Sequence, residues 1–283
     1  MFYTELPPHP ALAQHVRCIW VFESGASDAF GSPVDELQTI VPDGHPELLL
    51  HYGDLFSEVS NDVTVVQSRA LFAGQIAQPL VLQPGATAGV IGVRFRPAGA
   101  RALLGMSMAE NTDCRLDLTQ VWGRDAELLL EEVHAAHDAD GRARVVERFL
   151  IRRLANARLT PDAALSACIE QLHLAGGGIT VDALAARCQL SGRQLERRFL
   201  REVGIPPRLL ASIFRFRRLF DLLEQGQTGR WSDAALSAGY FDQAHMIRDF
   251  KRFAGLQPQA FHDGLAGLSA AMVGAADEGA RAA

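Results

Sequence analysis

The first 113 residues of the chain carry short runs of hydrophobic positions that suit strands. These runs lie at residues 16–22, 47–51, 63–66 and 90–95. Clusters of Pro, Gly, Asp and Asn separate them, for example at residues 42–44 and 84–85, and such clusters are typical of turns. The pattern predicts a small β-barrel or sandwich.

Between residues 118 and 154 the apolar residues recur at intervals of three and four, the period of a helix. Gly141 interrupts this segment, so we expect one helix on each side of it. The apolar stripes of these helices suit packing against the β-rich part, against the C-terminal domain or against a second protomer. The apolar positions are Leu128, Leu129, Val133, Val145, Val146, Phe149, Leu150 and Leu154.

Thr160, Pro161 and Asp162 predict the start of a new domain. Thr caps helices and Pro is favoured at the first helical position. The predicted fold class is α+β. We expect a β-rich domain at 1–115, a helical linker or dimerisation segment at 116–158, an all-α domain at 159–263 and a flexible tail at 264–283, which is rich in Ala and Gly.

An internal repeat lies in the all-α domain. Residues 182–199 align with residues 233–250 without a gap, at a constant offset of 51. Asp182 matches Asp233, and Phe199 matches Phe250. The match continues beyond these segments, where Gly204 meets Gly255 and Pro207 meets Pro258. A gapless repeat of this length predicts two copies of one structural unit.

Each copy has the pattern of two helices joined by a tight connection. Thr180 and Ser232 are the expected caps of the first helices, and Ser191 and Asp242 those of the second helices. Gly239 ends the first helix of the second copy, and Cys188 holds that place in the first copy. Each copy therefore has the organisation of a helix-turn-helix unit.

The second helix of each copy presents arginine on its free face. Buried positions are expected at Leu195 and Phe199 in the first copy, and at Met246, Phe250 and Phe253 in the second. An α-helix fills the major groove, and Arg donates two hydrogen bonds to guanine. The outward residues are Arg193, Glu196, Arg197 and Arg201 in the first copy, and Ala244, Arg248, Lys251 and Arg252 in the second.

Residues 207–224 join the two copies and show helical spacing of Leu209, Ile213, Phe216, Phe220 and Leu223. A helix of this size is roughly 27 Å long at about 1.5 Å per residue. Such a rod can separate two recognition helices by about one turn of DNA, roughly 34 Å. One protomer is therefore expected to reach two successive segments of the major groove.

The charge of the chain supports this interpretation once it is divided. The formal net charge is −6, of which residues 1–162 contribute −8, residues 163–262 contribute +4 and the tail contributes −2. A basic domain beside an acidic one is expected where only the first meets phosphate.

The C-terminal domain resembles the AraC/XylS family of bacterial transcription regulators over residues 163–262. The motifs that carry the resemblance are LAARCQLSGRQLERRFLREVGIPP from Leu184, RFRRLFDLL from Arg215 and AGYFDQAHMIRDFKRFAGLQPQAF from Ala238. The resemblance implies a sequence-specific transcription factor that binds an operator or promoter, acts in the cytoplasm and contacts RNA polymerase. No cofactor is implied.

The family's base-reading positions fall on Arg193, Glu196 and Arg197 in the first unit, and on Ala244, His245 and Arg248 in the second. The helix starts at Ser191 and Asp242, with the flanking arginines, are expected to hold phosphates. Ala244 stands where the family commonly has Ser or Gln, and it can only touch a thymine methyl. The second unit is therefore expected to read less sequence.

The N-terminal half resembles the sensor portion of some AraC-type regulators. The resemblance is carried by IVPDGHPELLLHYGD from Ile40 and GVRFRPAGARALLG from Gly92. It implies a cupin-like β-barrel that binds a small effector or mediates formation of a homodimer.

The competing hypothesis is a cupin-like metal-dependent enzyme with a helical appendage. His45, Glu47 and His51 share one face of an extended strand, as metal ligands do. However, Pro46 interrupts the ladder, and no paired His-x-His motif is present. We assign no metal, cofactor or catalytic residue. Stoichiometric iron, zinc or manganese in the purified protein would favour the enzyme.

Two further features concern the cellular compartment. No run of 18 consecutive apolar residues occurs, and the first ten residues lack the pattern of a secretion signal. The sequence thus predicts a cytoplasmic protein without a membrane partner. The cysteines lie far apart, which predicts buried, reduced thiols at Cys18, Cys114, Cys168 and Cys188.

Overall fold

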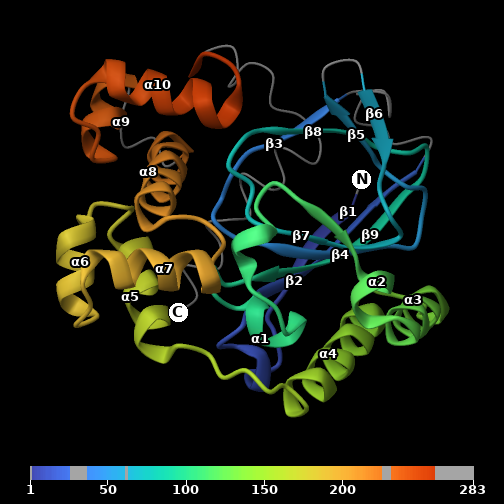
Figure 1. Ribbon diagram of the computed structural model, residues 1–283. Coiled ribbons are helices and arrows are strands. Elements are labelled where there is room, and N and C mark those ends of the chain that lie inside the picture. Colours follow the sequence, from blue (N-terminus) through green and yellow to red (C-terminus); the bar gives the residue numbers. More distant parts are fainter. Residues whose placement is uncertain (1, 26–36, 61–62, 225–230, 259–283) are drawn as a thin grey trace.

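The computed structural model describes residues 2–25, 37–60, 63–224 and 231–258 (Figure 1). The predicted tail 264–283 and residues 259–263 of the predicted C-terminal domain lie outside this range. Figure 1 shows a β-rich domain beside a helical C-terminal domain. Within the described residues, no helix is both long enough and apolar enough to cross a bilayer.

Two antiparallel sheets form the N-terminal domain, which confirms the predicted β-rich architecture. The predicted runs at 47–51 and 63–66 are strands with those bounds. The six-stranded sheet has the order β1 (Phe2–Leu6), β2 (Val16–Ser24), β9 (Ala88–Phe95), β4 (Glu47–His51), β7 (Ala70–Ala73) and β10 (Arg115–Asp117). The four-stranded sheet has the order β3 (Gln38–Ile40), β8 (Leu80–Gln83), β5 (Ser57–Ser60) and β6 (Val63–Val66).

Alternation along β2 divides the apolar side chains between two cores. Ile19 and Val21 belong to the cluster that packs against helices. Trp20 and Phe22 belong to the cluster between the sheets. Gly92, the partner of Trp20 in the register of β2 and β9, makes room for the indole, because a Cβ there would lie 2.1 Å from a ring carbon. The six-stranded sheet is therefore covered on both faces.

Helices cover the outer face of this sheet. They comprise α1 (Ala100–Leu104), α2 (Leu118–Trp122), α3 (Arg124–Ala135) and α4 (Ala139–Ala155). The predicted boundary at Gly141 is wrong, because Gly141 lies in the first turn of α4, where its N–H donates to the cap Asp138. The breaks fall instead at Gly123, which has φ +55°, and between Ala135 and Ala139.

The C-terminal domain consists of short helices around the long helix α8, whose bounds agree with the predicted 207–224. The set comprises α5 (Ala163–Leu174), α6 (Val181–Arg187), α7 (Gly192–Glu202), α8 (Pro207–Glu224), α9 (Trp231–Ser237) and α10 (Gln243–Ala254). The predicted cap Thr160 is wrong, because Asp162 accepts from the N–H of Leu165 and begins α5. Ser232 lies inside α9 rather than before it.

The two domains share a packed border. Val41 of the N-terminal domain belongs to the core of the C-terminal domain. Arg101 of α1 pairs with Glu202 at the end of α7 (Nη1 to Oε1, 3.2 Å). The Thr112 hydroxyl donates to the carbonyl of Gly204 at 2.8 Å. The N-terminal domain therefore contacts both the first helix-turn-helix unit and the apolar core of the C-terminal domain.

The cysteines within the described residues form no disulfide, and Cys18 and Cys168 are buried as predicted. The prediction is wrong for Cys114, which is exposed, and for Cys188, which is only half-buried.

Candidate nucleic-acid interface and interior cavity

The second helices of both repeat copies begin at the predicted caps. The Ser191 hydroxyl accepts from the N–H of Gln194, whose side chain in turn accepts from the N–H of Ser191. The Asp242 carboxylate accepts from the N–H of His245 at 2.6 Å. Ser, unlike Asp, leaves the positive end of its helix without a carboxylate, so the start of α7 is the more favourable neighbour for a phosphate.

The outer face of α7 matches the predicted pattern of exposure. Leu195 and Phe199 are fully buried, whereas Arg193, Glu196 and Arg197 are exposed. Within the described part of the chain, neither Arg193 nor Arg197 makes a side-chain hydrogen bond or ion pair. Both guanidinium groups therefore keep their donors available for an external acceptor.

Arg201 differs from the other outward residues of α7. Its Nε lies 3.0 Å from Oε1 of Glu202, which is buried and also pairs with Arg101 of the N-terminal domain. Arg201 is half exposed, at 49% of its side chain. This side chain belongs to the domain border, which weakens the prediction that it contacts DNA.

The outer face of α10 carries fewer polar groups. Ala244, Arg248, Lys251 and Arg252 are exposed, and Met246, Phe250 and Phe253 are buried. The guanidinium of Arg252 lies over the ring of Phe253, at 5.2 Å from its centroid. Arg248 and Lys251 have no ion-pair partner among the described residues.

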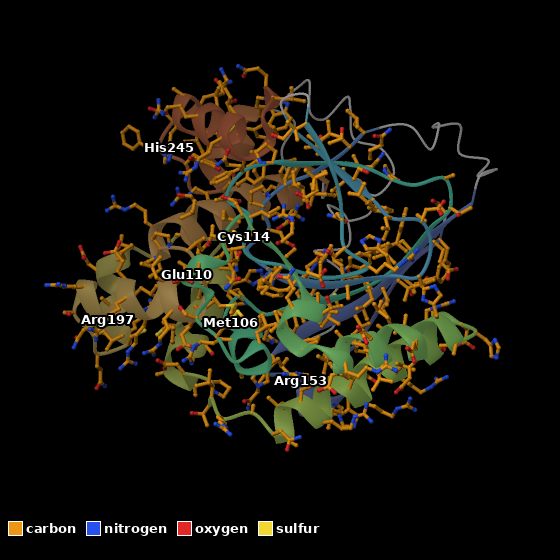
Figure 2. All side chains as sticks on the ribbon, turned by 45° about the vertical axis from the view of Figure 1, so that its right-hand side comes forward. Met106, Glu110, Cys114, Arg153, Arg197 and His245 are labelled. Atoms are coloured by element: carbon orange, nitrogen blue, oxygen red, sulfur yellow. The ribbon has the colours of Figure 1, made fainter. Side chains whose placement is uncertain are left out.

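His245 is only partly available to a ligand. Its ring packs edge-on against Tyr240 at 5.1 Å between centroids, and Nε2 lies 3.8 Å from the carboxylate of Asp249. Burial raises the pKa of Asp249. Figure 2 shows His245 and Arg197 on the side of the molecule away from the β-rich domain.

A surface groove connects the two helix-turn-helix units. It is lined by Gly192 and Glu196 of α7, Arg208 of α8 and Arg252 of α10, among others. Arg208 is exposed at the second position of α8. The sequence did not indicate Arg208 as a site residue, because it lies on the connecting helix rather than on either repeat.

A cavity lies inside the N-terminal domain. The space not occupied by atoms, its mouth included, is about 820 Å³. Most of its wall is apolar, and polar groups come from β4, from the loop before it, and from Gln67 and Arg115. Arg217 of α8 also lines the cavity, so the C-terminal domain supplies part of the wall.

The predicted shared face is confirmed for Glu47 and His51, which line the cavity together with Leu49. It is wrong for His45, because β4 begins at Glu47. His45 lines the cavity from the preceding loop, and its Nδ1–H donates to the carbonyl of Phe95, 2.8 Å away. No group of three His, Cys, Asp or Glu residues suited to a metal ion occurs among the described residues. These side chains are engaged in hydrogen bonds and ion pairs instead.

Arg94 is the centre of the ionic network behind this wall. It is almost completely buried, and its Nε lies 2.9 Å from Glu47 and 3.6 Å from Asp43. Its Nη1 lies 3.2 Å from Glu5. Burial alone would raise the pKa of Asp43, but the charges of Arg94 and Arg217 and the backbone N–H of His45 hold that pKa below its usual range. The positive charge of Arg217 on α8 therefore helps to lower the pKa of Asp43 in the cavity wall.

Comparison with known proteins matches both domains. A family model described as a helix-turn-helix domain matches residues 184–263, and one described as a domain of unknown function (DUF6597) matches residues 4–117. The comparison with curated proteins found no match.

The comparison with solved structures found matches at low sequence identity and with TM-scores below 0.5. ToxT from Vibrio cholerae is 12% identical over 88% of this chain and 98% of its own, with a TM-score of 0.48. Unsaturated fatty acid bound wild-type ToxT is 13% identical over 88% of this chain and 95% of its own, with a TM-score of 0.46. The AraC-like transcriptional activator CuxR is 15% identical over 80% of this chain and 96% of its own, with a TM-score of 0.25.

The helix-turn-helix match covers all but the first residues of the repeat, together with the helix between the two copies, and this segment defines a DNA-binding domain. More particularly, the domain is of the AraC type, and the chain is a transcription regulator of that type.

Proposed function

We propose that this regulator binds double-stranded DNA with α7 and α10 in two successive segments of the major groove. The observation that supports the proposal is the pair of exposed arginines, Arg197 and Arg248, at matching positions of the repeat. The 18-residue helix α8 connects the units as a rod. Its length of roughly 27 Å suits a separation of about one DNA turn.

The two helices contribute unequally in this proposal. On α7, Arg193, Glu196 and Arg197 read bases, and the helix start at Ser191 holds a phosphate. On α10, Arg248 reads bases while Lys251 and Arg252 hold phosphates. Ala244 contributes at most a contact with a thymine methyl, and His245 is held against Tyr240.

We also propose that a small effector in the N-terminal cavity regulates DNA binding. The loop before β4 supplies Asp43 and His45 to the cavity wall. In the same loop, Gly44 lies directly against Phe214 and Leu210 of α8. A ligand that moves this loop also moves the helix that sets the spacing of the two recognition helices. The alternative regulatory route is self-association through α3 and α4.

In this proposal the protein regulates transcription by binding and does not catalyse a reaction. Its partners are an operator or promoter in the bacterial cytoplasm and, at that promoter, RNA polymerase.

The experiment that tests DNA recognition starts from genomic fragments selected by the purified protein. Fluorescence anisotropy then compares the selected duplex with a random duplex of equal length over a series of salt concentrations. The logarithm of the association constant should fall linearly with the logarithm of the salt concentration for both duplexes, because each phosphate contact releases counterions. The selected duplex should bind more tightly at every salt concentration. A flat salt dependence, or equal affinity for both duplexes, would contradict the proposal.

A further inference from the structure

We infer that the cavity of the N-terminal domain binds a neutral, mainly apolar small molecule whose hydroxyl or N–H group donates a hydrogen bond to His51. The inference rests on the proposed effector function and gives the chemical class of the effector. It follows from three properties of the wall: its charges are balanced, a chain of hydrogen bonds fixes the tautomer of His51, and its remaining surface is apolar.

The charges that line the cavity are balanced. Arg94 lies beside Asp43, Glu47 and Glu5. Burial raises the pKa of Glu47, and Arg217 also acts on Asp43. Arg115 pairs with Glu58 at 2.9 Å. Burial lowers the pKa of His45 to about 3 and that of His51 to about 4, so both rings are neutral. An ionised ligand would lose its hydration without gaining a counter-charge, which is unfavourable.

The hydrogen-bonding direction at His51 is fixed by its neighbours. The ionised carboxylate of Glu58 can only accept, so it takes the N–H of the Gln67 amide at 2.9 Å. The amide oxygen of Gln67 therefore faces Nε2 of His51, 3.1 Å away, and Nε2 carries the proton. Nδ1 of the same ring is then an acceptor.

This acceptor has no hydrogen-bond partner within the described residues, although His51 is 1% exposed and lines the cavity. A buried acceptor without a donor is costly, and a ligand that supplies the donor recovers that cost. The geometry thus favours an alcohol, a phenol or an N–H compound over a ligand that only accepts.

The rest of the wall suits an apolar body. Phe56 packs edge-on against His51 at 5.2 Å between centroids, so an aromatic surface lies beside the free acceptor. The indole N–H of Trp20 is already donated to Glu47. The other apolar residues of the wall include Ile40, Leu49, Leu80, Leu82 and Val90.

Three probes of similar shape test the inference on the wild-type chain: 4-propylphenol, its methyl ether 4-propylanisole, and the anion 4-propylbenzoate. Binding is measured by calorimetry and by tryptophan emission, because Trp20 lines the cavity. We expect the phenol to bind about fivefold to tenfold more tightly than the ether, the usual gain from one hydrogen bond. The benzoate should bind more weakly than the phenol.

Two variants locate the site. His51→Phe should bind the phenol and the ether equally, because the acceptor is gone. Leu80→Phe narrows the cavity but keeps His51, so it should weaken both probes and keep their ratio.

The inference would be overturned if the wild type bound the benzoate more tightly than the phenol. It would also be overturned if the wild type bound the phenol and the ether equally, or bound none of the three probes. These outcomes are separate from failure of the proposed function, which the affinity for the selected duplex decides.

Discussion

Two adjacent arginines on α7 show how the position of a residue on its helix decides its role. Arg198 is turned toward the domain and pairs with Asp162, the cap of α5, at 2.9 Å. Arg197, one residue earlier, is turned outward and has no partner among the described residues. The rotation of 100° per residue thus separates an arginine that holds the domain together from one that is free to meet DNA.

Arg197→Ala should lower affinity for the selected duplex by about 1–3 kcal/mol and relax the preference at one base position, since an arginine that reads guanine contributes about this much. Competition binding with selected and random duplexes measures both effects. Arg148→Ala is the matched control, because Arg148 is an exposed arginine of α4 far from the repeat in sequence. Equal losses on both duplexes would show that Arg197 contacts phosphate instead.

The neutral, buried His51 makes the N-terminal domain sensitive to acid. Burial lowers its pKa from 6.5 to about 4, so between these values the unfolded chain binds a proton that the folded chain does not. The free energy of unfolding therefore falls as the pH drops through this window, by at most about 1.4 kcal/mol per pH unit.

In urea titrations, His51→Gln should show a shallower loss of stability from pH 6.5 to pH 4 than the wild type. His134→Gln, at an exposed position of α3, is the control and should keep the wild-type slope. Identical slopes in all three proteins would contradict a neutral His51.

At the scale of elements, the turn at Gly44 is the point where the cavity loop meets α8. Gly44 has φ +85°, and a Cβ there would lie 2.8 Å from the ring of Phe214 and 2.9 Å from Leu210. Gly105 has φ +73°, and no atom of the described residues beyond its two chain neighbours would lie within 4 Å of its Cβ. A residue with a side chain would be strained at both positions by the positive φ, but only at position 44 would its Cβ also collide with neighbouring side chains.

Gly44→Ala should therefore destabilise the protein by about 1–3 kcal/mol more than Gly105→Ala, which is the usual cost of overpacking. Denaturant unfolding of both variants measures the difference. Equal destabilisation would show that the loop and α8 are not packed tightly.

The sequence predicts best those elements whose own pattern determines them. The bounds of α8 follow from a complete apolar stripe, and the caps Ser191 and Asp242 follow from local chemistry. β5 and β10 were not predicted, since Ser57–Ser60 and Arg115–Asp117 are short and mainly polar. Their conformation depends on strands that are distant in the sequence.

The residues of the candidate sites could likewise be predicted where the period of a single helix or strand determines their position. The outward arginines follow from the helical period, and the shared face of Glu47 and His51 follows from the strand period. The participation of Gln67, Arg115 and Arg217 in the cavity was not predictable, because it requires the pairing of distant strands and the docking of α8.

At the scale of the whole molecule, the border between the domains joins the cavity to the elements that hold α7 and α10. Glu202 at the end of α7 pairs with Arg101, and Arg217 of α8 lines the cavity. Both contacts lie next to elements that position the recognition helices. Effector binding is therefore expected to change DNA affinity through α7 and α8 rather than through the outward arginines themselves.

The central claim is that one protomer reads two major-groove segments with unequal helices. Protection of guanine N7 from methylation on the selected duplex tests it most directly, because N7 lies in the major groove. We expect two protected clusters about 10 base pairs apart on one face. Arg197→Ala should remove a contact in one cluster, and Arg248→Ala should remove one in the other. A single protected cluster, or two clusters that neither variant changes, would contradict the account.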